Sequence, residues 1–344
     1  MRVLVTGGTG IVGAEVRDQL TRGGRWEVTC VARRPGLDPG TVTWNMSAEP
    51  PPKALAGHWD AIVHCAADTR WSQTADEALR ANVHSLAALA AVASADTHVL
   101  QVSTAAIVGP RSDEGRSDDP AHYRNMYEWS KARAERVARE CFARLSIVRP
   151  PLVIGRRGDG RAARFAGMYM LLRGIAASSV PAIVANPDGY FDVIPVDDLA
   201  SVIVGALRGP GDGEVLTVAC GRAAPRVRTV IEVICNALNE WRGDRGVAAL
   251  DVPPFLDPES WTRFYRPFSR DVLSRRQLLT LDHLDQFLPY LQLTEPFVPT
   301  HQVIDVEAAM PPSVRYWAQT HPRLAALTPR PWQATSPEVQ SCPK

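Results

Sequence analysis

Short runs of apolar, β-branched residues alternate with longer amphipathic segments through the first two thirds of the chain. The runs are RVLVTG, WEVTCVA, TVTWN, AIVHCAA, HVLQVST and LSIVRPPLVIG, and helical patterns cover about 10–22, 77–95 and 125–143. The strands are continuously apolar rather than alternating, which is typical of a sheet buried on both faces. Strands that alternate with helices at this spacing predict an α/β fold with a doubly wound, parallel, Rossmann-type sheet.

After residue 155 the pattern loosens. An arginine-rich loop, GRRGDGRAAR, precedes an apolar helix near 165–173, and prolines and aromatic residues dominate from 252 onward. We therefore predict a Rossmann domain over 1–155 with a return segment at about 190–221. A smaller substrate-binding lobe is expected over 156–189 and 222–330, followed by a flexible tail over 331–344. The alternative for the smaller lobe is a packed accessory subdomain that binds no ligand.

Composition excludes several functional classes. The 344 residues carry a formal net charge of +1 and are 45% hydrophobic, an ordinary globular balance that argues against a nucleic-acid partner. Strand-like residues begin at Arg2, which leaves no room for a leader, and no run of about 18 apolar residues predicts membrane insertion. We expect a cytoplasmic protein that is a monomer or a homodimer.

The cysteines and histidines do not suggest a metal site. Six cysteines are scattered without a C-x-x-C pair, and eight histidines show no ligand spacing. Reduced thiols and no bound metal are therefore expected. His64 falls inside an apolar strand, so we interpret it as a strand residue beside a ligand rather than a base.

A glycine-rich loop, VTGGTGIVGAEV, follows the first strand and opens the first helix. Glycines at this junction allow a tight turn and a close backbone approach to a pyrophosphate, with helix amides directed at its negative charge. The strand-loop-helix context is the one that this motif requires, so the loop predicts a dinucleotide cofactor. The residues expected to hold it are Gly7, Thr9, Gly10, Ile11, Val12 and Gly13.

The second strand ends with Arg33 and Arg34, where a NAD-specific site usually has an acidic residue. Guanidinium groups suit a 2′-phosphate, so we predict NADP(H) as the cofactor; the alternative is that the two arginines only solvate a turn. The residues after the third and fourth strands should line the adenine and the rest of the cofactor: Asn45, Met46, Cys65, Ala66 and Ala67.

Tyr127 and Lys131 lie four positions apart on a predicted helix and therefore share a face. The fifth strand places Ser103 and Thr104 at the carboxyl edge of the sheet, where ligands bind in this fold. The ammonium is expected to lower the pKa of the phenol, the phenol to protonate an oxygen that gains charge, and the hydroxyl to donate a second hydrogen bond.

Five segments taken in order resemble the extended short-chain dehydrogenase/reductase superfamily over residues 1 to about 208. They are TGGTGIVG, VSTAAIVG, YEWSK, SIVRPPLVIG and DVIPVDDLA. Within it, NMYEWSKARAE and VSTA are most similar to thioester reductases and fatty acyl-CoA reductases, the male-sterility group. The resemblance implies that Tyr127 and Lys131 are the acid and its partner and that Thr104 supplies the hydroxyl. It also implies that Asn82 supports the active-site helix and that RPPLV, with Pro150 and Val153, passes beside the nicotinamide.

Members of this group use NADPH to reduce an acyl thioester on coenzyme A or a carrier protein to an aldehyde and sometimes to an alcohol. The resemblance therefore implies such a reductase, with Tyr127 as proton donor. The same catalytic residues also serve carbonyl reductases, hydroxysteroid-type dehydrogenases and nucleotide-sugar epimerases, which remain alternatives, and a non-catalytic NADP-binding protein is a third. The segment after residue 222 carries no comparable motif.

Two charged groups have competing interpretations. Asp197 and Asp198 precede a helix, where we expect them to stabilise its amino end rather than act in catalysis. The cluster after the sixth strand either binds the phosphates of coenzyme A or of a phosphopantetheine arm, or is solvated. Its members are Arg156, Arg157, Arg161 and Arg164.

Overall fold

The computed structural model describes residues 1–34, 40–107, 117–177 and 182–328, and the chain forms two compact units. Unit 1 contains Met1–Met168, Asp192–Ala224 and Phe297–Ser313. Unit 2 contains Tyr169–Phe191, Pro225–Pro296 and the described residues from Val314 on.

Unit 1 is built on an eight-stranded sheet in the order β12-β10-β6-β5-β4-β1-β2-β3, in which every pair of neighbours is parallel. The strands are β1 (Arg2–Thr6), β2 (Glu27–Ala32), β3 (Thr41–Thr43), β4 (Ala61–His64), β5 (His98–Val102), β6 (Arg144–Arg149), β10 (Asp212–Ala219) and β12 (His301–Gln302). The chain winds outward in both directions from β1, as the apolar strands predict. The α/β fold with a doubly wound parallel sheet is confirmed.

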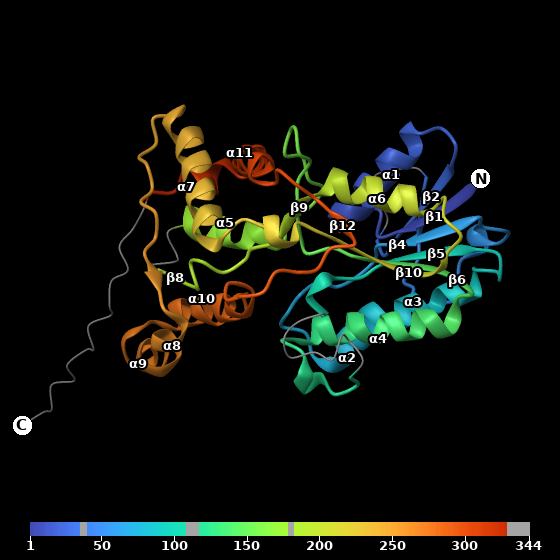
Figure 1. Cartoon of the computed structure of the whole chain (residues 1–344), viewed down its shortest axis with the longest axis horizontal. Coiled ribbons are helices and arrows are strands. Elements are labelled where there is room, and N and C mark those ends of the chain that lie inside the picture. Colours follow the sequence, from blue (N-terminus) through green and yellow to red (C-terminus); the bar gives the residue numbers. More distant parts are fainter. Residues whose placement is uncertain (35–39, 108–116, 178–181, 329–344) are drawn as a thin grey trace, which may run out of the picture. The chain divides into compact units, whose positions relative to one another are not determined.

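Helices cover both faces of this sheet (Figure 1). On one face lie α1 (Ile11–Arg22) and α6 (Val196–Ala206); on the other lie α2 (Ala75–Ala78), α3 (Ser85–Ala87) and α4 (Met126–Cys141). The core under α4 is continuous and apolar, with Leu4, Ile62 and Val99 of the sheet packed with Ala134 and Ala138 of the helix. Two further short strands, β7 (Leu152–Ile154) and β9 (Val193–Pro195), pair with each other.

The helix expected over about 77–95 is not continuous. After α2, the chain forms a π-helical turn, η2 (Leu79–His84), then α3 and a 3₁₀ turn, η3 (Ala88–Ala91). A Thr74–Glu77 capping box fixes where α2 begins. The wider π turn contains Asn82, whose side chain bonds to residues outside the helix, so the irregular segment accompanies a polar anchor.

Unit 2 consists mainly of helices. They are α5 (Met168–Ala176, all but its first residue in this unit), α7 (Val227–Gly243), α8 (Pro258–Ser260), α9 (Arg266–Val272), α10 (Arg275–Asp285), α11 (Met310–Thr320, from Val314 on) and α12 (Pro322–Ala325). A small parallel pair joins β8 (Ile183–Val184) to β11 (Phe255–Leu256). A small apolar cavity of about 40 Å³ lies within this unit; Leu171, Ile183, Trp261, Leu281, Phe287 and Leu291 are among the residues that line it.

The unit boundaries differ from those predicted in two places. Residues 156–168 belong to unit 1, and the segment Phe297–Ser313 returns to unit 1 because β12 pairs with β10. Arg157 helps to hold this return, since its Nη1 donates to the main-chain oxygen of Asp305 at 2.8 Å. A two-residue strand carries no readable period, so the sequence could not reveal it. The predicted tail over 331–344 lies outside the described residues.

No helix in the described part of the chain is long and apolar enough to cross a membrane.

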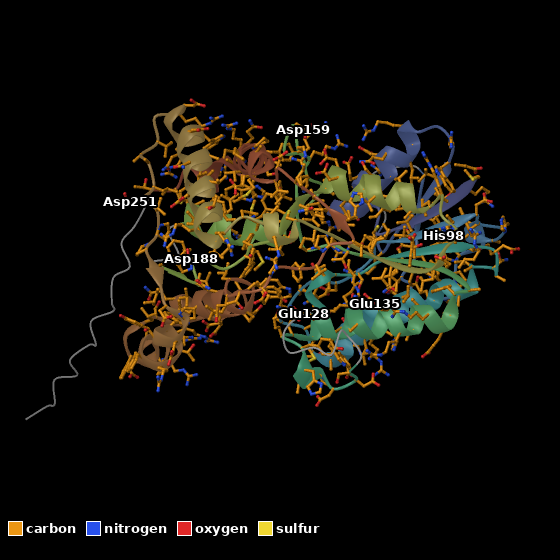
Figure 2. The ribbon with its side chains drawn as sticks, in the orientation of Figure 1. His98, Glu128, Glu135, Asp159, Asp188 and Asp251 are labelled. Atoms are coloured by element: carbon orange, nitrogen blue, oxygen red, sulfur yellow. The ribbon has the colours of Figure 1, made fainter. Side chains whose placement is uncertain are left out.

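A buried ion pair ties α4 to the sheet. Glu135 of α4, labelled in Figure 2, accepts from Arg149 of β6 through Nη2 at 2.6 Å and Nε at 2.8 Å. The Glu135 side chain is 2% exposed and that of Arg149 is 14% exposed. Both charges are thus largely withdrawn from water and depend on each other.

We therefore expect Glu135→Gln to lower the free energy of unfolding by about 2 kcal/mol, because Arg149 would keep its charge without a carboxylate partner. Urea denaturation measures the change. The matched control is Glu140→Gln, a substitution at an exposed position of the same helix, which should change stability by less than about 0.5 kcal/mol. Equal effects of the two substitutions would contradict a stabilising role for the pair.

Candidate active site

The glycine loop leaves no space for side chains between β1 and α1. Gly7 has φ +68°, and a Cβ there would lie 2.7 Å from the backbone nitrogen of Ala66. A Cβ on Gly13 would lie 2.8 Å from the carbonyl carbon of Gly7. The loop is held by Gly7 N, which donates to Val31 O at 3.1 Å, and by Gly10 N, which donates to Gly7 O at 2.8 Å. The backbone itself therefore forms a close-fitting cradle at the carboxyl edge of the sheet.

The amino end of α1 faces this cradle with exposed peptide dipoles. Gly10 is the N-cap and forms no side-chain cap, so the first-turn amides depend on another acceptor. Ile11 and Val12 are half-buried, whereas Thr9 is exposed and its main-chain oxygen accepts from Arg164 Nε at 3.2 Å. This arrangement fits the pyrophosphate of a dinucleotide.

Arg33 and Arg34 follow β2 and are exposed, which fits both a phosphate-binding role and the alternative of a solvated turn. An acidic residue, Asp68, lies in the loop after β4, on the other side of β1. Its carboxylate is bound by Arg70, whose Nη2 donates at 2.7 Å and whose Nε donates to both oxygens at 3.0 Å. Burial alone would raise the pKa of Asp68, but the hydrogen bonds of Arg70 and the charges of Arg70 and Arg33 hold it below its ordinary value.

The other predicted cofactor residues lie at the same edge with varied surroundings. Asn45 Oδ1 accepts from Ser47 Oγ at 3.1 Å, and Met46 packs against the apolar core. Ala66 N donates to Thr6 Oγ1 at 3.3 Å, and Ala67 is exposed. Burial raises the pKa of the Cys65 thiol to about 12 although the charge of Lys131 acts in the opposite direction. These residues lie at the carboxyl edge of the sheet, where the sequence predicted them. Their contact with a cofactor stays a prediction.

Helix α4 presents Tyr127 and Lys131 one turn apart. The amino end of the helix is fixed by its N-cap, Asn125, whose side chain accepts a hydrogen bond from Glu128 N at 3.0 Å. Tyr127 is hydrogen-bonded to Thr104, so the phenol and the hydroxyl are brought together as predicted. The expected lowering of the phenol pKa is wrong: burial and the negative charge of Glu128 raise the pKa of Tyr127, and the Thr104 hydrogen bond opposes them. The phenol is therefore protonated at neutral pH.

Lys131 is 2% exposed, and its Nζ donates to the main-chain oxygen of Val102 at 2.7 Å. Burial lowers the pKa of Lys131 to about 8, while the negative charge of Glu135 acts to raise it. The amino group thus changes charge close to physiological pH, which an exposed lysine does not.

The remaining predicted residues lie in the loops after β5 and β6 and in β7. Ser103 is buried, and its Oγ has no hydrogen-bond partner among the described residues. Thr104 Oγ1 also accepts from Ala106 N at 3.2 Å. Pro150 is buried and its oxygen accepts from Ala105 N at 2.8 Å, while Val153 lies in β7 opposite Ile194. The loop after β6 thereby touches the loop after β5 directly.

Asn82 connects the loop at Asp68 to helix α4. Its Oδ1 accepts from Asp68 N at 2.8 Å, and its Nδ2 donates to Asp68 O at 3.2 Å and to Ser130 Oγ at 2.8 Å. Ser130 Oγ in turn donates to Tyr127 O at 2.9 Å. The π-helical turn is therefore linked to α4 through a serine beside the lysine.

The arginine cluster is engaged within unit 1 rather than simply solvated. Arg156 pairs with Glu15 at 2.5 Å and Asp18 at 2.8 Å, and Arg157 pairs with Asp198. Asp197 Oδ1 accepts from Arg157 N at 2.9 Å. The two aspartates thus have structural partners, as favoured, but they bind Arg157 rather than capping the amides of α6. Arg161 and Arg164 remain exposed.

Sequence reasoning missed Asp68, the Glu135–Arg149 pair and Gln101 of β5. The only signal for Gln101 was a polar residue inside the apolar run HVLQV. Among the described residues, no three His, Cys, Asp or Glu side chains gather in a way that could hold a metal ion.

The sequence is similar to a known protein family. Residues 49–203, somewhat less than half of the chain, match the family described as male sterility protein, an NAD-binding family. The resemblance drawn from its motifs is therefore confirmed, and the domain is of the NAD(P)-binding kind. No curated protein matches the sequence.

Solved structures with the same fold include reductase domains and epimerases. The terminal R domain from the myxalamid PKS-NRPS biosynthetic pathway has a TM-score of 0.63 at 18% identity, covering 94% of this chain and 91% of that one. An archaeal thiolation-reductase di-domain from a non-ribosomal peptide synthetase has 0.62 at 15%, covering 94% and 91%. Human epimerase family protein SDR39U1, solved with NADPH, has 0.59 at 21%, covering 93% and 99%. At these identities the likeness shows the fold alone.

His64 is a neutral structural residue. Its Nδ1 lies 2.8 Å from Thr6 Oγ1, and burial together with the charge of Lys131 lowers the pKa of His64 to about 3. An unfolded histidine titrates near 6.5. The unfolded chain therefore takes up this proton first as the pH falls, and stability decreases from about pH 6.5 downward.

We expect His64→Asn, which can keep a partner for Thr6, to flatten the loss of stability on acidification. A single group contributes a slope approaching about 1.4 kcal/mol per pH unit between the two pKa values. The measurement is the unfolding free energy from pH 4 to pH 7. His84→Asn, a change at an exposed histidine, is the control and should leave the slope unchanged.

Proposed function

We propose that this protein is an NADPH-dependent reductase that converts an acyl thioester, bound to coenzyme A or a carrier protein, to an aldehyde and in some cases to an alcohol. The observation that carries the proposal is the placement of Tyr127 beside the Thr104 hydroxyl and one helical turn from Lys131. All three residues lie within the segment that matches the male sterility family.

The residues at the sheet edge fit a dinucleotide. The cradle at Gly7 and Gly13 admits a phosphate where side chains would collide, and Ser103 offers an unpartnered hydroxyl. When bound, the nicotinamide supplies a hydride to the substrate carbonyl. The glycine loop and the amino end of α1 would hold the pyrophosphate, Arg33 the 2′-phosphate, and Lys131 the ribose next to the nicotinamide.

The chain itself contributes a proton and hydrogen bonds. As the carbonyl carbon is reduced, its oxygen gains negative charge and takes the proton from the hydroxyl of Tyr127. Thr104 donates a second hydrogen bond to the same oxygen. The hemithioacetal formed from a thioester then breaks its carbon–sulfur bond, which releases an aldehyde and a thiol. The ammonium of Lys131 stabilises the phenolate that remains on Tyr127.

Two observations favour a thioester over a sugar nucleotide. The family match is to the male sterility group, and two of the structural neighbours are reductase domains of synthetase assemblies.

The decisive assay offers the purified protein NADPH with acyl-CoA and acyl-carrier-protein thioesters of several chain lengths. Ketones and nucleotide sugars form the comparison panel. Oxidation of NADPH with release of free thiol supports the proposal. Turnover of a ketone or epimerisation of a sugar nucleotide, without any thioester reduction, would assign the protein to another activity of the superfamily.

Tyr127→Phe should reduce turnover by about 10²- to 10⁴-fold because it removes only the proton that reaches the substrate oxygen. NADPH affinity, measured by fluorescence titration, should change less than about threefold. Tyr190→Phe is the matched control because Tyr190 lies outside unit 1 and is not among the residues that line the cavity of unit 2. Full activity of Tyr127→Phe would remove the assignment of the proton donor.

The choice of NADPH over NADH rests on Arg33. Arg33→Ala should weaken NADPH binding about 10- to 100-fold, since a charged hydrogen bond to the 2′-phosphate is lost, and should leave NADH binding nearly unchanged. Calorimetric titration with both cofactors measures the effect, and Arg25→Ala at another exposed position is the control. Equal weakening for both cofactors would instead indicate that Arg33 does not distinguish them.

A further inference from the structure

A row of polar side chains interrupts the apolar face of the sheet under α4. Thr6, His64 and Gln101 are register partners on the neighbouring strands β1, β4 and β5. Partners in a parallel sheet point to the same face. The row continues to Val31 on one side and Ile147 on the other, and both belong to the core packed under α4. Three polar residues therefore lie inside an otherwise apolar layer.

Most of the polar atoms in this row have no partner in the described residues. His64 Nε2, Gln101 Nε2, Gln101 Oε1 and Ser103 Oγ are all buried and unbonded, and Ser103 lies two residues beyond Gln101 on the same face. His64 is 1% exposed, Gln101 is fully buried, and Ser103 is 3% exposed. Burying so many donors and acceptors without partners is strongly unfavourable, and a polar site of this kind normally holds ordered water.

The amino group of Lys131 lies beside the row. Lys131 occupies the same face of α4 as Ala134, which packs in the core with Ile62 and Val99, the residues two positions before His64 and Gln101. Its charge acts on His64. An ammonium has three donors, and among the described residues the hydrogen bond found for Nζ goes to Val102 O. Donors thus remain for water.

Asn82 cannot supply this water site. Both hydrogens of its Nδ2 are used by Asp68 O and Ser130 Oγ, and its Oδ1 accepts from Asp68 N. The unsatisfied groups next to the lysine belong instead to β4 and β5.

We propose that the row formed by His64, Gln101 and Ser103 binds ordered water that accepts hydrogen bonds from the amino group of Lys131. His64 and Gln101 are then positioning residues that act on Lys131 through this water. The inference rests on the proposed function only in giving Lys131 a part in turnover; the water site itself is a property of the free protein.

The chain allows a direct measurement because it contains only three lysines, Lys53, Lys131 and Lys344. Protein labelled with ¹³C at lysine Cε gives three signals, and Lys131→Met identifies the one to follow. The groups that face Lys131 and titrate or carry charge are Glu135 on its own helix, Cys65 and His64 on β4 and its following loop, and Tyr127 one turn before it. They are unchanged in the variant below.

Gln101→Met keeps the length and volume of the side chain but removes its amide, so the fold should be retained. Loss of the water that stabilises the charged amine should lower the pKa of Lys131 by about one unit. The control is His98→Asn. His98, labelled in Figure 2, is buried at the start of the same strand, where its Nε2 lies 2.9 Å from Ser146 Oγ. This control should alter stability without moving the Lys131 titration.

A crystal structure of the free wild-type protein that resolves water should show a molecule within hydrogen-bond distance of Gln101 and Lys131 Nζ. A dry row, or Gln101 bonded directly to His64, overturns the proposal. So does an unchanged Lys131 titration in Gln101→Met, or an equal shift in His98→Asn. Because these experiments need no substrate, the water site can stand even if every thioester assay fails. If turnover is found, its alkaline limb should shift with the Lys131 titration.

Discussion

The candidate active site of unit 1 contains a lysine whose amino group is buried under a helix. Lys131 lies between α4 and the sheet, where burial lowers the pKa of its amino group to about 8. Removing the charged amino group from water is unfavourable, and the surrounding structure offsets this in part. Val102 O accepts a hydrogen bond from the amino group, and Glu135 supplies a negative charge one turn away. Glu135 is itself held by Arg149 of β6. The same ion pair that fixes α4 on the sheet therefore sets the electrostatics of the lysine.

The parts of the fold that could be predicted are those whose residue types follow directly from the local structure. Continuous apolar β-branched runs are typical of strands covered on both faces, and these runs located the strands from β1 to β6. The glycine loop was predictable for a different reason. Gly7 adopts a positive φ, and a Cβ on Gly13 would collide with the Gly7 backbone, so no other residue type fits either position. The helix with Tyr127 and Lys131 followed from its period of 3.6 residues and the asparagine that caps it.

Features that depend on contacts between distant segments were not predictable. Asp68 lies near Arg33 because β2 and β4 flank β1. An acidic residue is therefore close to this arginine although β2 itself is followed by two arginines. The pKa of Tyr127 is raised because its phenol is withdrawn from water and because the neighbouring Glu128 carries a negative charge, and sequence spacing does not report withdrawal from water. The return of Phe297–Ser313 to unit 1 involves a strand of two residues. In each case the deciding quantity is a tertiary distance.

The use of lysine at position 131 has a physical reason that the rest of the chain makes clear. Of 38 basic residues only three are lysines, and apart from one histidine pair the ion pairs found among the described residues use arginine. Arginine holds a fixed planar charge, whereas an ammonium is compact and can lose its proton when buried. Lysine rather than arginine suits a position beneath α4 where the side chain bonds a main-chain oxygen and has a pKa lowered by burial. The polar row under the helix is where the remaining donors of that lysine can be satisfied.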